Sequence, residues 1–171
     1  MWTVISLATN KVRRQTGLHH TVSVYAKQVT QGKLRDQCCP DEIAACQRHL
    51  DDLKRQGTPE FPYVFDTTRA DRIIRFMELL VQVRGPYAGQ RIKLQPWQVF
   101  DLGCLYGWVD MHTGARRFTV SLNVRARGNV KSTENSGKAL YAMTSDACYP
   151  PYHPELARYE MEPEVECAAV D

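Results

Sequence analysis

The sequence predicts an α/β protein in which several helices precede one strand–loop–helix unit. Apolar residues recur at helical spacing in successive segments of the first two thirds of the chain. An apolar run at residues 119–124 is typical of a buried strand. A basic loop, residues 125–130, joins this run to Lys131-Ser132-Thr133, which opens another segment with helical spacing.

Composition places the chain among ordinary globular proteins. Its 171 residues are enough for one sizeable core, and a net charge of +3 neither favours nor excludes a nucleic-acid partner. No apolar run is long enough to span a membrane, and the apolar start lacks the positive residues of a signal peptide. The six cysteines include no Cys-x-x-Cys pair, so we expect reduced thiols in a cytosolic protein in preference to a zinc site.

The first half of the chain predicts two helices. One covers residues 21–29 and ends before Gly32; its apolar face consists of Val22, Tyr25, Ala26 and Val29. The second begins at Pro40, where a proline and the following acids suit a helix N-terminus. Its apolar stripe is Ile43, Cys46, Leu50 and Leu53. We expect the opposite side to be a solvated face, made of Arg48, His49, Asp51, Asp52, Lys54 and Arg55.

A short extended piece, residues 63–65, and two more helices follow. Asp66 or Thr67 caps the first helix. Its wide apolar face is formed by Ile73, Ile74, Phe76, Met77, Leu80 and Val81. The second helix begins at Pro96 and closes at Gly107 and Trp108. Beyond the basic loop we expect a helix that ends near Asp146 and a second strand at residues 165–170.

The layout of strand, basic loop, Lys-Ser and helix is typical of a phosphate-binding loop. Lys131 would supply a cation to the β- and γ-phosphates, and the hydroxyl of Ser132 would bind Mg²⁺. Backbone N–H groups from Gly128 to Ser132 would point at the anion, and Arg127 is placed to touch phosphate oxygens. The alternative is a basic surface turn with no ligand.

Two residues depart from the usual phosphate-loop pattern, which has glycine at both positions: Arg125 stands six residues before the lysine, and Val130 directly before it. A β-branched residue resists the left-handed backbone that glycine allows there. Gln98, at the start of a helix, offers a donor and an acceptor to the N6 and N7 edge of adenine. Its alternative is an exposed helix glutamine beside a core tryptophan.

Taken in order, these residues resemble the amino-terminal part of the large terminase subunit of tailed bacteriophages, the motor that packages DNA. The resemblance covers roughly residues 22–171. It rests on the order and spacing of Pro96-Trp97-Gln98, Gly107-Trp108, Arg116-Arg117-Phe118 and the loop that begins at Arg125. In that family the loop characteristically begins with arginine, so Arg125 fits the family pattern and Val130 remains the departure.

The resemblance implies an incomplete three-layer fold of the P-loop NTPase type. It implies a helical lead-in over residues 1–60 and the start of an ATPase domain over residues 61–171. It implies an arginine-finger-like catalytic role for Arg127, and Ser132 as a ligand of Mg²⁺. The implied binding residues for ATP are Gln98, Arg127, Gly128, Asn129, Val130, Lys131, Ser132 and Thr133.

The family also implies partners and a location. The partners are double-stranded phage DNA, the portal protein, the small terminase subunit and further copies of the chain in a ring. The location is the cytoplasm of the host bacterial cell during virion assembly. The family's Walker B acids are not found after Lys131, so we expect this chain alone to bind nucleotide weakly and not to hydrolyse it.

Two other interpretations remain. One is a non-catalytic module that contacts DNA or protein and has a decayed loop. The other is an unrelated P-loop NTPase that matches by chance.

Overall fold

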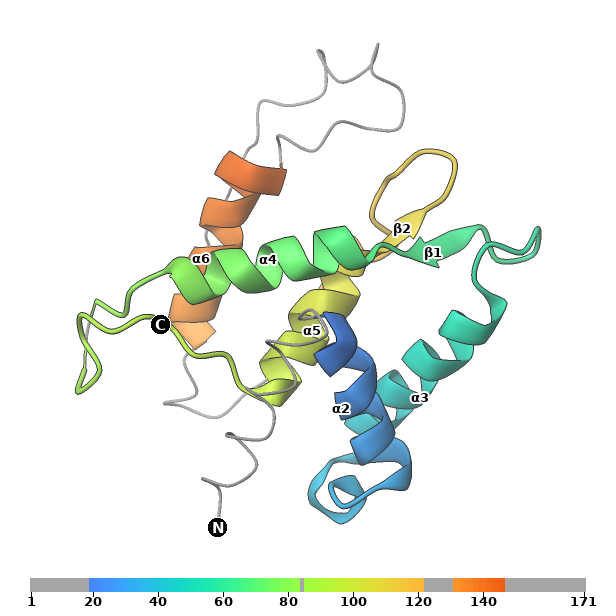
Figure 1. The fold of residues 1–171 in the computed structure, drawn as a ribbon, viewed down its shortest axis with the longest axis horizontal. Helices are drawn as coiled ribbons and strands as arrows, with labels where there is room; N and C mark the ends of the chain where they lie inside the picture. Colours follow the sequence, from blue (N-terminus) through green and yellow to red (C-terminus); the bar gives the residue numbers. More distant parts are fainter. Residues whose placement is uncertain (1–18, 84, 122–130, 147–171) are drawn as a thin grey trace.

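The described part of the protein is a mixed α/β structure in which helices predominate and a small sheet contains two strands. A computed structural model describes residues 19–83, 85–121 and 131–146 (Figure 1). In this part of the chain no helix is both long and apolar enough to cross a membrane.

The first two predicted helices are confirmed and pack against each other. Helix α2 spans His19–Gln31 and buries all four residues of its predicted apolar face. A short 3-10 turn, η1, spans Arg35–Gln37, and helix α3 follows at Pro40–Arg55. Proline occupies the first turn of α3, where its missing N–H costs no hydrogen bond.

The charged side of α3 is not uniformly solvated, contrary to the sequence prediction. His49 and Asp52 are 2% and 1% exposed, whereas Arg48 and Asp51 lie on the surface. The core-facing side of α3 is therefore wider than its apolar stripe and includes two polar side chains. Both must be compensated by hydrogen bonds or ion pairs within the protein.

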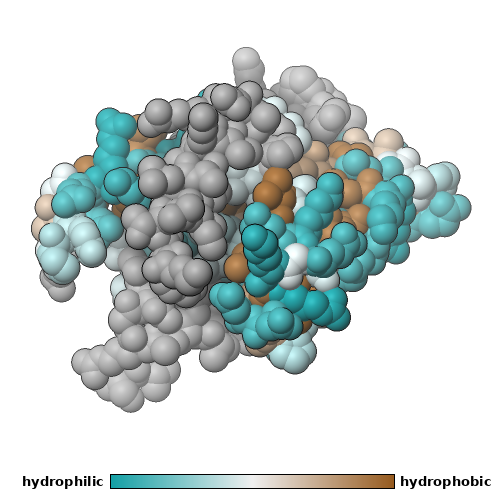
Figure 2. Space-filling view, turned by 60° about the horizontal axis from the view of Figure 1, so that its bottom comes forward, coloured by the Kyte–Doolittle hydropathy of each residue, from teal (hydrophilic) through white to brown (hydrophobic). Residues whose placement is uncertain are grey.

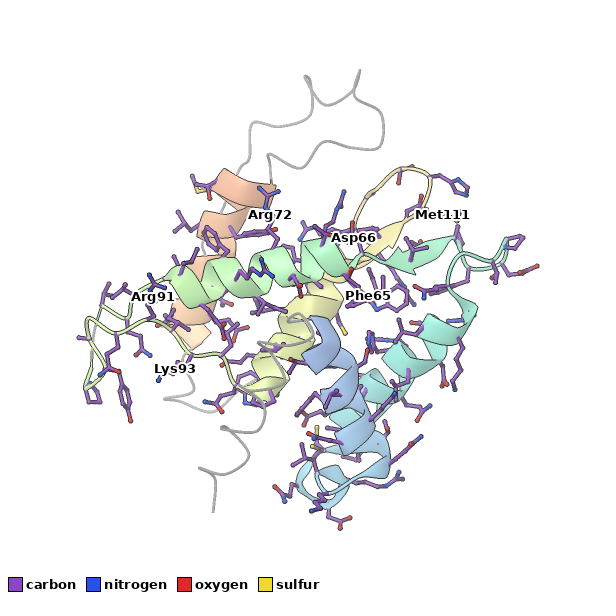
Figure 3. The ribbon with its side chains drawn as sticks, in the orientation of Figure 1. Phe65, Asp66, Arg72, Arg91, Lys93 and Met111 are labelled. Carbon is purple, nitrogen blue, oxygen red and sulfur yellow. The ribbon has the colours of Figure 1, made fainter. Side chains whose placement is uncertain are left out.

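Strand β1, Tyr63–Phe65, leads directly into helix α4, Thr67–Leu79 (Figure 3). Asp66 at this junction is the N-cap, and its carboxylate accepts hydrogen bonds from the backbone N–H groups of Thr68 and Arg69. The helix ends at Leu79. Val81, expected on its apolar face, instead lies beyond the helix and is 49% exposed.

Helix α5, Pro96–Gly107, is followed at once by strand β2, Trp108–Asp110, which the sequence prediction missed. Strand β2 pairs antiparallel with β1, placing Val64 opposite Val109 and Phe65 opposite Trp108. Gly107 allows a close approach at this junction, because a Cβ atom there would lie 2.7 Å from the Phe65 ring.

Helix α6 spans Lys131–Tyr141 and continues as a π-helical turn, η2, over Ala142–Asp146. The helix predicted after the basic loop is therefore confirmed. The strand predicted at residues 119–124 is wrong for residues 119–121, which are not in a strand. Residues 122–124 and the second predicted strand, 165–170, lie outside the described residues.

One hydrophobic cluster joins these helices. Helix α5 contacts α2 and α4, and α4 crosses α6 (Figure 1). Ile73, Ile74 and Leu102 are fully buried at its centre, each worth about 1.5–3 kcal/mol of transfer free energy. The cluster extends from Val22 to Tyr141, so it includes residues on both sides of residue 60. The division into 1–60 and 61–171 stays a prediction.

Several large hydrophobic side chains are exposed at the surface, among them Val83, Val120 and Leu79. In Figure 2, hydrophilic side chains cover most of the coloured face, with hydrophobic residues visible between them.

Candidate functional site

The predicted phosphate loop ends at the N-terminus of α6. Arg127, Gly128, Asn129 and Val130 lie outside the described residues. Lys131 is the first residue of the helix, with Ser132 exposed and Thr133 half-buried in the first turn. The first N–H groups of a helix have no partner within it and carry partial positive charge, so this end favours an anion.

Gln98 lies in the first turn of α5 and is 6% exposed. Its Oε1 accepts a hydrogen bond from the backbone N–H of Gln95 at 2.9 Å, and the Gln95 side chain in turn accepts from the Gln98 backbone. The predicted alternative of an exposed glutamine is therefore wrong. This reciprocal pair is a capping box built from two glutamines, and it fixes the start of α5.

The second partner of Gln98 comes from α6. Its Nε2 donates to Oε2 of Glu134 at 3.1 Å, across 36 residues of sequence. Glu134 is 3% exposed, and its Oε1 lies 2.7 Å from Nζ of Lys138, one turn further along α6. The lysine compensates the charge of the buried carboxylate. Neither Glu134 nor Lys138 was predicted from the sequence to have a role at the site.

The structure thus brings together two predicted parts of one nucleotide site. Gln98 is linked by one side chain to the first turns of the helix that begins with Lys131 and Ser132. For Mg²⁺, the exposed hydroxyl of Ser132 fits the role of a ligand, whereas the carboxylate of Glu134 is engaged by Lys138. No group of three or more His, Cys, Asp or Glu side chains suited to a metal occurs among the described residues.

A second polar cluster surrounds His49 on α3. The indole N–H of Trp108 donates to His49 Nδ1 at 3.1 Å, which places the imidazole proton on Nε2, 3.2 Å from Ser23 Oγ. Burial lowers the pKa of His49 to about 4, and the opposing effect of nearby Asp52 is smaller. The ring is therefore neutral at pH 7.

This geometry excludes serine nucleophile chemistry at His49. A general base for Ser23 would need an unprotonated Nε2 facing the hydroxyl, and the Trp108 bond imposes the opposite tautomer. The nearby thiol of Cys104 is also unreactive, because burial raises its pKa well above the usual value and keeps it protonated. We assign this cluster a structural role.

Asp52 holds two arginines on the same side of α3. Its Oδ2 accepts from Arg117 at 2.5 Å, and its Oδ1 accepts from Arg55 at 2.6 Å. The Arg117 guanidinium also stacks near the rings of Phe61 and Phe118, at 4.7 and 4.8 Å from their centroids. Arg117, to which the sequence assigned no chemistry, is thus a packing and ion-pair residue.

A small cleft lies between α3, α5 and residues 118–121. Its volume is about 180 Å³, and its lining includes Arg48, Asp101, Leu105 and Phe118. Drug-sized ligands occupy pockets of about 300–1,000 Å³, so this cleft is too small for a whole nucleotide. Gln98 does not line it.

Comparisons with known proteins found no matching family model, no matching curated protein and no matching solved structure. The kinship with terminases stays a prediction from the sequence.

Proposed function

We propose that this chain is the amino-terminal portion of a phage terminase large subunit and that it binds ATP at the N-terminus of α6. The observation that supports the proposal is the Gln98–Glu134 hydrogen bond. It joins the residue expected at adenine to the helix expected behind the phosphates. These two parts were predicted from separate stretches of sequence.

The chemistry follows from the residues at the helix end. The β- and γ-phosphates would meet the free N–H groups of the first turn of α6 and the cation of Lys131. Arg127 would stabilise charge on the γ-phosphate. Mg²⁺ held by Ser132 would neutralise charge on the phosphate oxygens.

A titration with a fluorescent ATP analogue and Mg²⁺ tests the nucleotide site. Lys131→Ala removes a charge-assisted contact worth about 1.5–3 kcal/mol, so its affinity should fall about tenfold or more. Lys33→Ala is the matched control, because Lys33 is an exposed lysine in the turn after α2. Indistinguishable binding curves for wild type and Lys131→Ala would refute the proposal of a nucleotide site.

Val130→Gly tests the one departure from the family loop. If the loop backbone is left-handed at this position, valine costs about 1–2 kcal/mol and glycine should tighten binding about five- to thirtyfold. Unchanged affinity would mean that Val130 is not the limiting feature. We expect no steady-state ATP hydrolysis by the chain alone, either as wild type or as Val130→Gly.

The alternative function is a non-catalytic module that contacts DNA or protein. The Gln98–Glu134 hydrogen bond favours this alternative in one respect, because the amide of Gln98 is already hydrogen-bonded within the protein and needs no nucleotide base as a partner. The titration separates the two functions. The terminase assignment further predicts that the purified chain binds a portal protein or small terminase subunit encoded in the same genome, in a pull-down experiment.

A further inference from the structure

The chain between α4 and α5 folds back on itself as a short hairpin, and one edge of this hairpin has no partner strand. We propose that this edge, residues 81–83, is a surface on which a second copy of the chain docks, by antiparallel pairing across a twofold axis at Gln82. The proposal does not depend on the ATP site. It concerns a closed pair of copies, which differs from the head-to-tail contacts of a ring.

Backbone hydrogen bonds hold the two arms of the hairpin together. The N–H of Ile92 donates to the C=O of Leu80 at 2.8 Å. The N–H of Gln82 donates to the C=O of Gln90 at 2.9 Å, and the C=O of Gln82 accepts from the N–H of Gly89 at 2.8 Å. On the first arm, the C=O of Leu80 and both backbone polar groups of Gln82 therefore point inward, toward the second arm.

The groups that point outward follow from the planarity of the peptide bond. A trans peptide points its N–H opposite to its C=O, and no peptide bond in the described part is cis. Because the C=O of Leu80 points inward, the N–H of Val81 points outward. The same reasoning at Gln82 turns the C=O of Val81 and the N–H of Val83 outward. None of these outward groups is hydrogen-bonded within the described part of the chain.

The side chains along this edge are apolar and exposed. Leu79, the last residue of α4, is 61% exposed, and Val81 and Val83 are 49% and 83% exposed. Residues 79–83 include no charged residue and no proline, with which natural proteins usually protect a free edge; the next residue, Arg84, lies outside the described part. In Figure 1 the chain after α4 extends away from the helices, which leaves this edge open to a partner.

A second copy fits this edge because the edge is its own complement. With the twofold axis at Gln82, the N–H of Val83 meets the C=O of Val81 in the other copy, and the two valine side chains lie next to each other. Arg91 is exposed and lies opposite Val81 on the second arm, so the joined sheet carries it on its outer strands. The outer strands are three strand spacings, or about 14 Å, apart. Salt screens charges beyond about 8–10 Å, so the two arginines do not oppose pairing.

Sedimentation equilibrium from about 1 to 300 µM measures the association, and the mass should rise from 19.6 kDa toward about twice that value. Val83→Lys brings two cations near the axis and should weaken association at least about tenfold. Val120→Lys is the matched control, because Val120 is 84% exposed and lies outside the hairpin. Equal effects of the two substitutions would overturn the proposal. A chain that stays monomeric at every concentration would refute the second copy as occupant and leave the edge to an extended segment of another protein.

A second charge tests the register. Val81→Glu alone should also weaken association, because it brings two carboxylates near the axis. Combining Val81→Glu with Val83→Lys would place each lysine opposite the glutamate of the other copy. Association of this double variant should be at least about fivefold tighter than that of either single variant. A double variant as weak as the single variants would refute antiparallel pairing at Gln82.

Hydrogen exchange of the unmodified chain needs no variant. The backbone N–H groups of Val81 and Val83 should exchange several-fold more slowly at about 300 µM than at about 1 µM, because pairing removes them from water. The N–H of Gln82 is already bonded within the hairpin, so its exchange rate should change less. Exchange rates of Val81 and Val83 that do not depend on concentration would overturn the proposal.

Discussion

Replacing Asp52 by asparagine should destabilise the protein far more than the same change at its neighbour Asp51. Asp52 is 1% exposed and pairs with Arg117, whose side chain is 16% exposed, and with Arg55, which is 57% exposed. Asp51 lies on the surface, where it pairs with Lys54. The two aspartates are adjacent in sequence and on the same helix, so each is a control for the other.

The magnitude depends mainly on Arg117. Arg55 is exposed, so water replaces much of what it loses when the carboxylate is neutralised. The Arg117 guanidinium is nearly enclosed and would remain charged among the aromatic rings without its counter-ion. Breaking a buried pair of this kind costs about 3 kcal/mol, a large part of the ~5–15 kcal/mol of a typical domain.

Urea denaturation followed by circular dichroism measures the effect. For a slope of about 1–3 kcal/mol per molar urea, a loss of about 3 kcal/mol lowers the midpoint by about 1–3 M. The midpoint for Asp51→Asn should barely move, because its pair is exposed. If both variants shift the midpoint equally, the reasoning about burial is refuted. Double-mutant cycles should also show stronger coupling of Asp52 to Arg117 than to Arg55.

Two further predictions concern pH and packing. Burial lowers the pKa of the His49 imidazole to about 4, whereas a histidine in the unfolded chain has a pKa of about 6.5. As pH falls from about 6.5 to 4, the imidazole is therefore protonated in the unfolded chain but not in the folded protein. The free energy of unfolding should drop by up to about 3 kcal/mol over this range. As pH is lowered from 7 to 4.5, the urea midpoint should fall less steeply for His49→Gln than for wild type or for the exposed control His112→Asn. Equal slopes for the three proteins would contradict the lowered pKa of His49. In Gly103→Ala the new Cβ would lie 2.5 Å from Cγ2 of buried Val22, a stiff side chain, and we expect a loss of about 1–3 kcal/mol. In Gly137→Ala the nearest atom is the flexible end of Met77 at 2.6 Å, so its midpoint should change less; the reverse order would refute this packing argument.

The features that the sequence predicted well are those that depend on near neighbours. The apolar face of α2 repeats at helical spacing, and the capping aspartate Asp66 precedes α4 directly, so both were visible within short windows. Strand β2 was missed because its three residues follow α5 without a break and are defined by pairing with β1. The strand expected at residues 119–124 is wrong over residues 119–121, because an apolar run alone does not supply a pairing partner; residues 122–124 lie outside the described residues.

The polar contacts of the core could not be predicted for the same reason. Asp52 looked like part of a solvated face because its partner Arg117 is 65 residues away. One signal was present: His49 and Asp52 follow Cys46 at successive three-residue intervals, which extends the buried side of α3. Glu134 offered no comparable signal, since its contact with Gln98 spans 36 residues.

These long-range contacts also bear on the predicted phosphate loop. Before it, Arg117 is anchored to α3 through Asp52; after it, Glu134 is anchored to α5 through Gln98. The two segments that flank the loop are thus attached to different helices, which share one hydrophobic cluster. Because a phosphate site depends on sub-ångström placement of backbone N–H groups, these anchors matter as much as the loop residues. A phosphate site at this loop would therefore depend on two polar pairs, Asp52–Arg117 and Gln98–Glu134, that lie outside the loop itself.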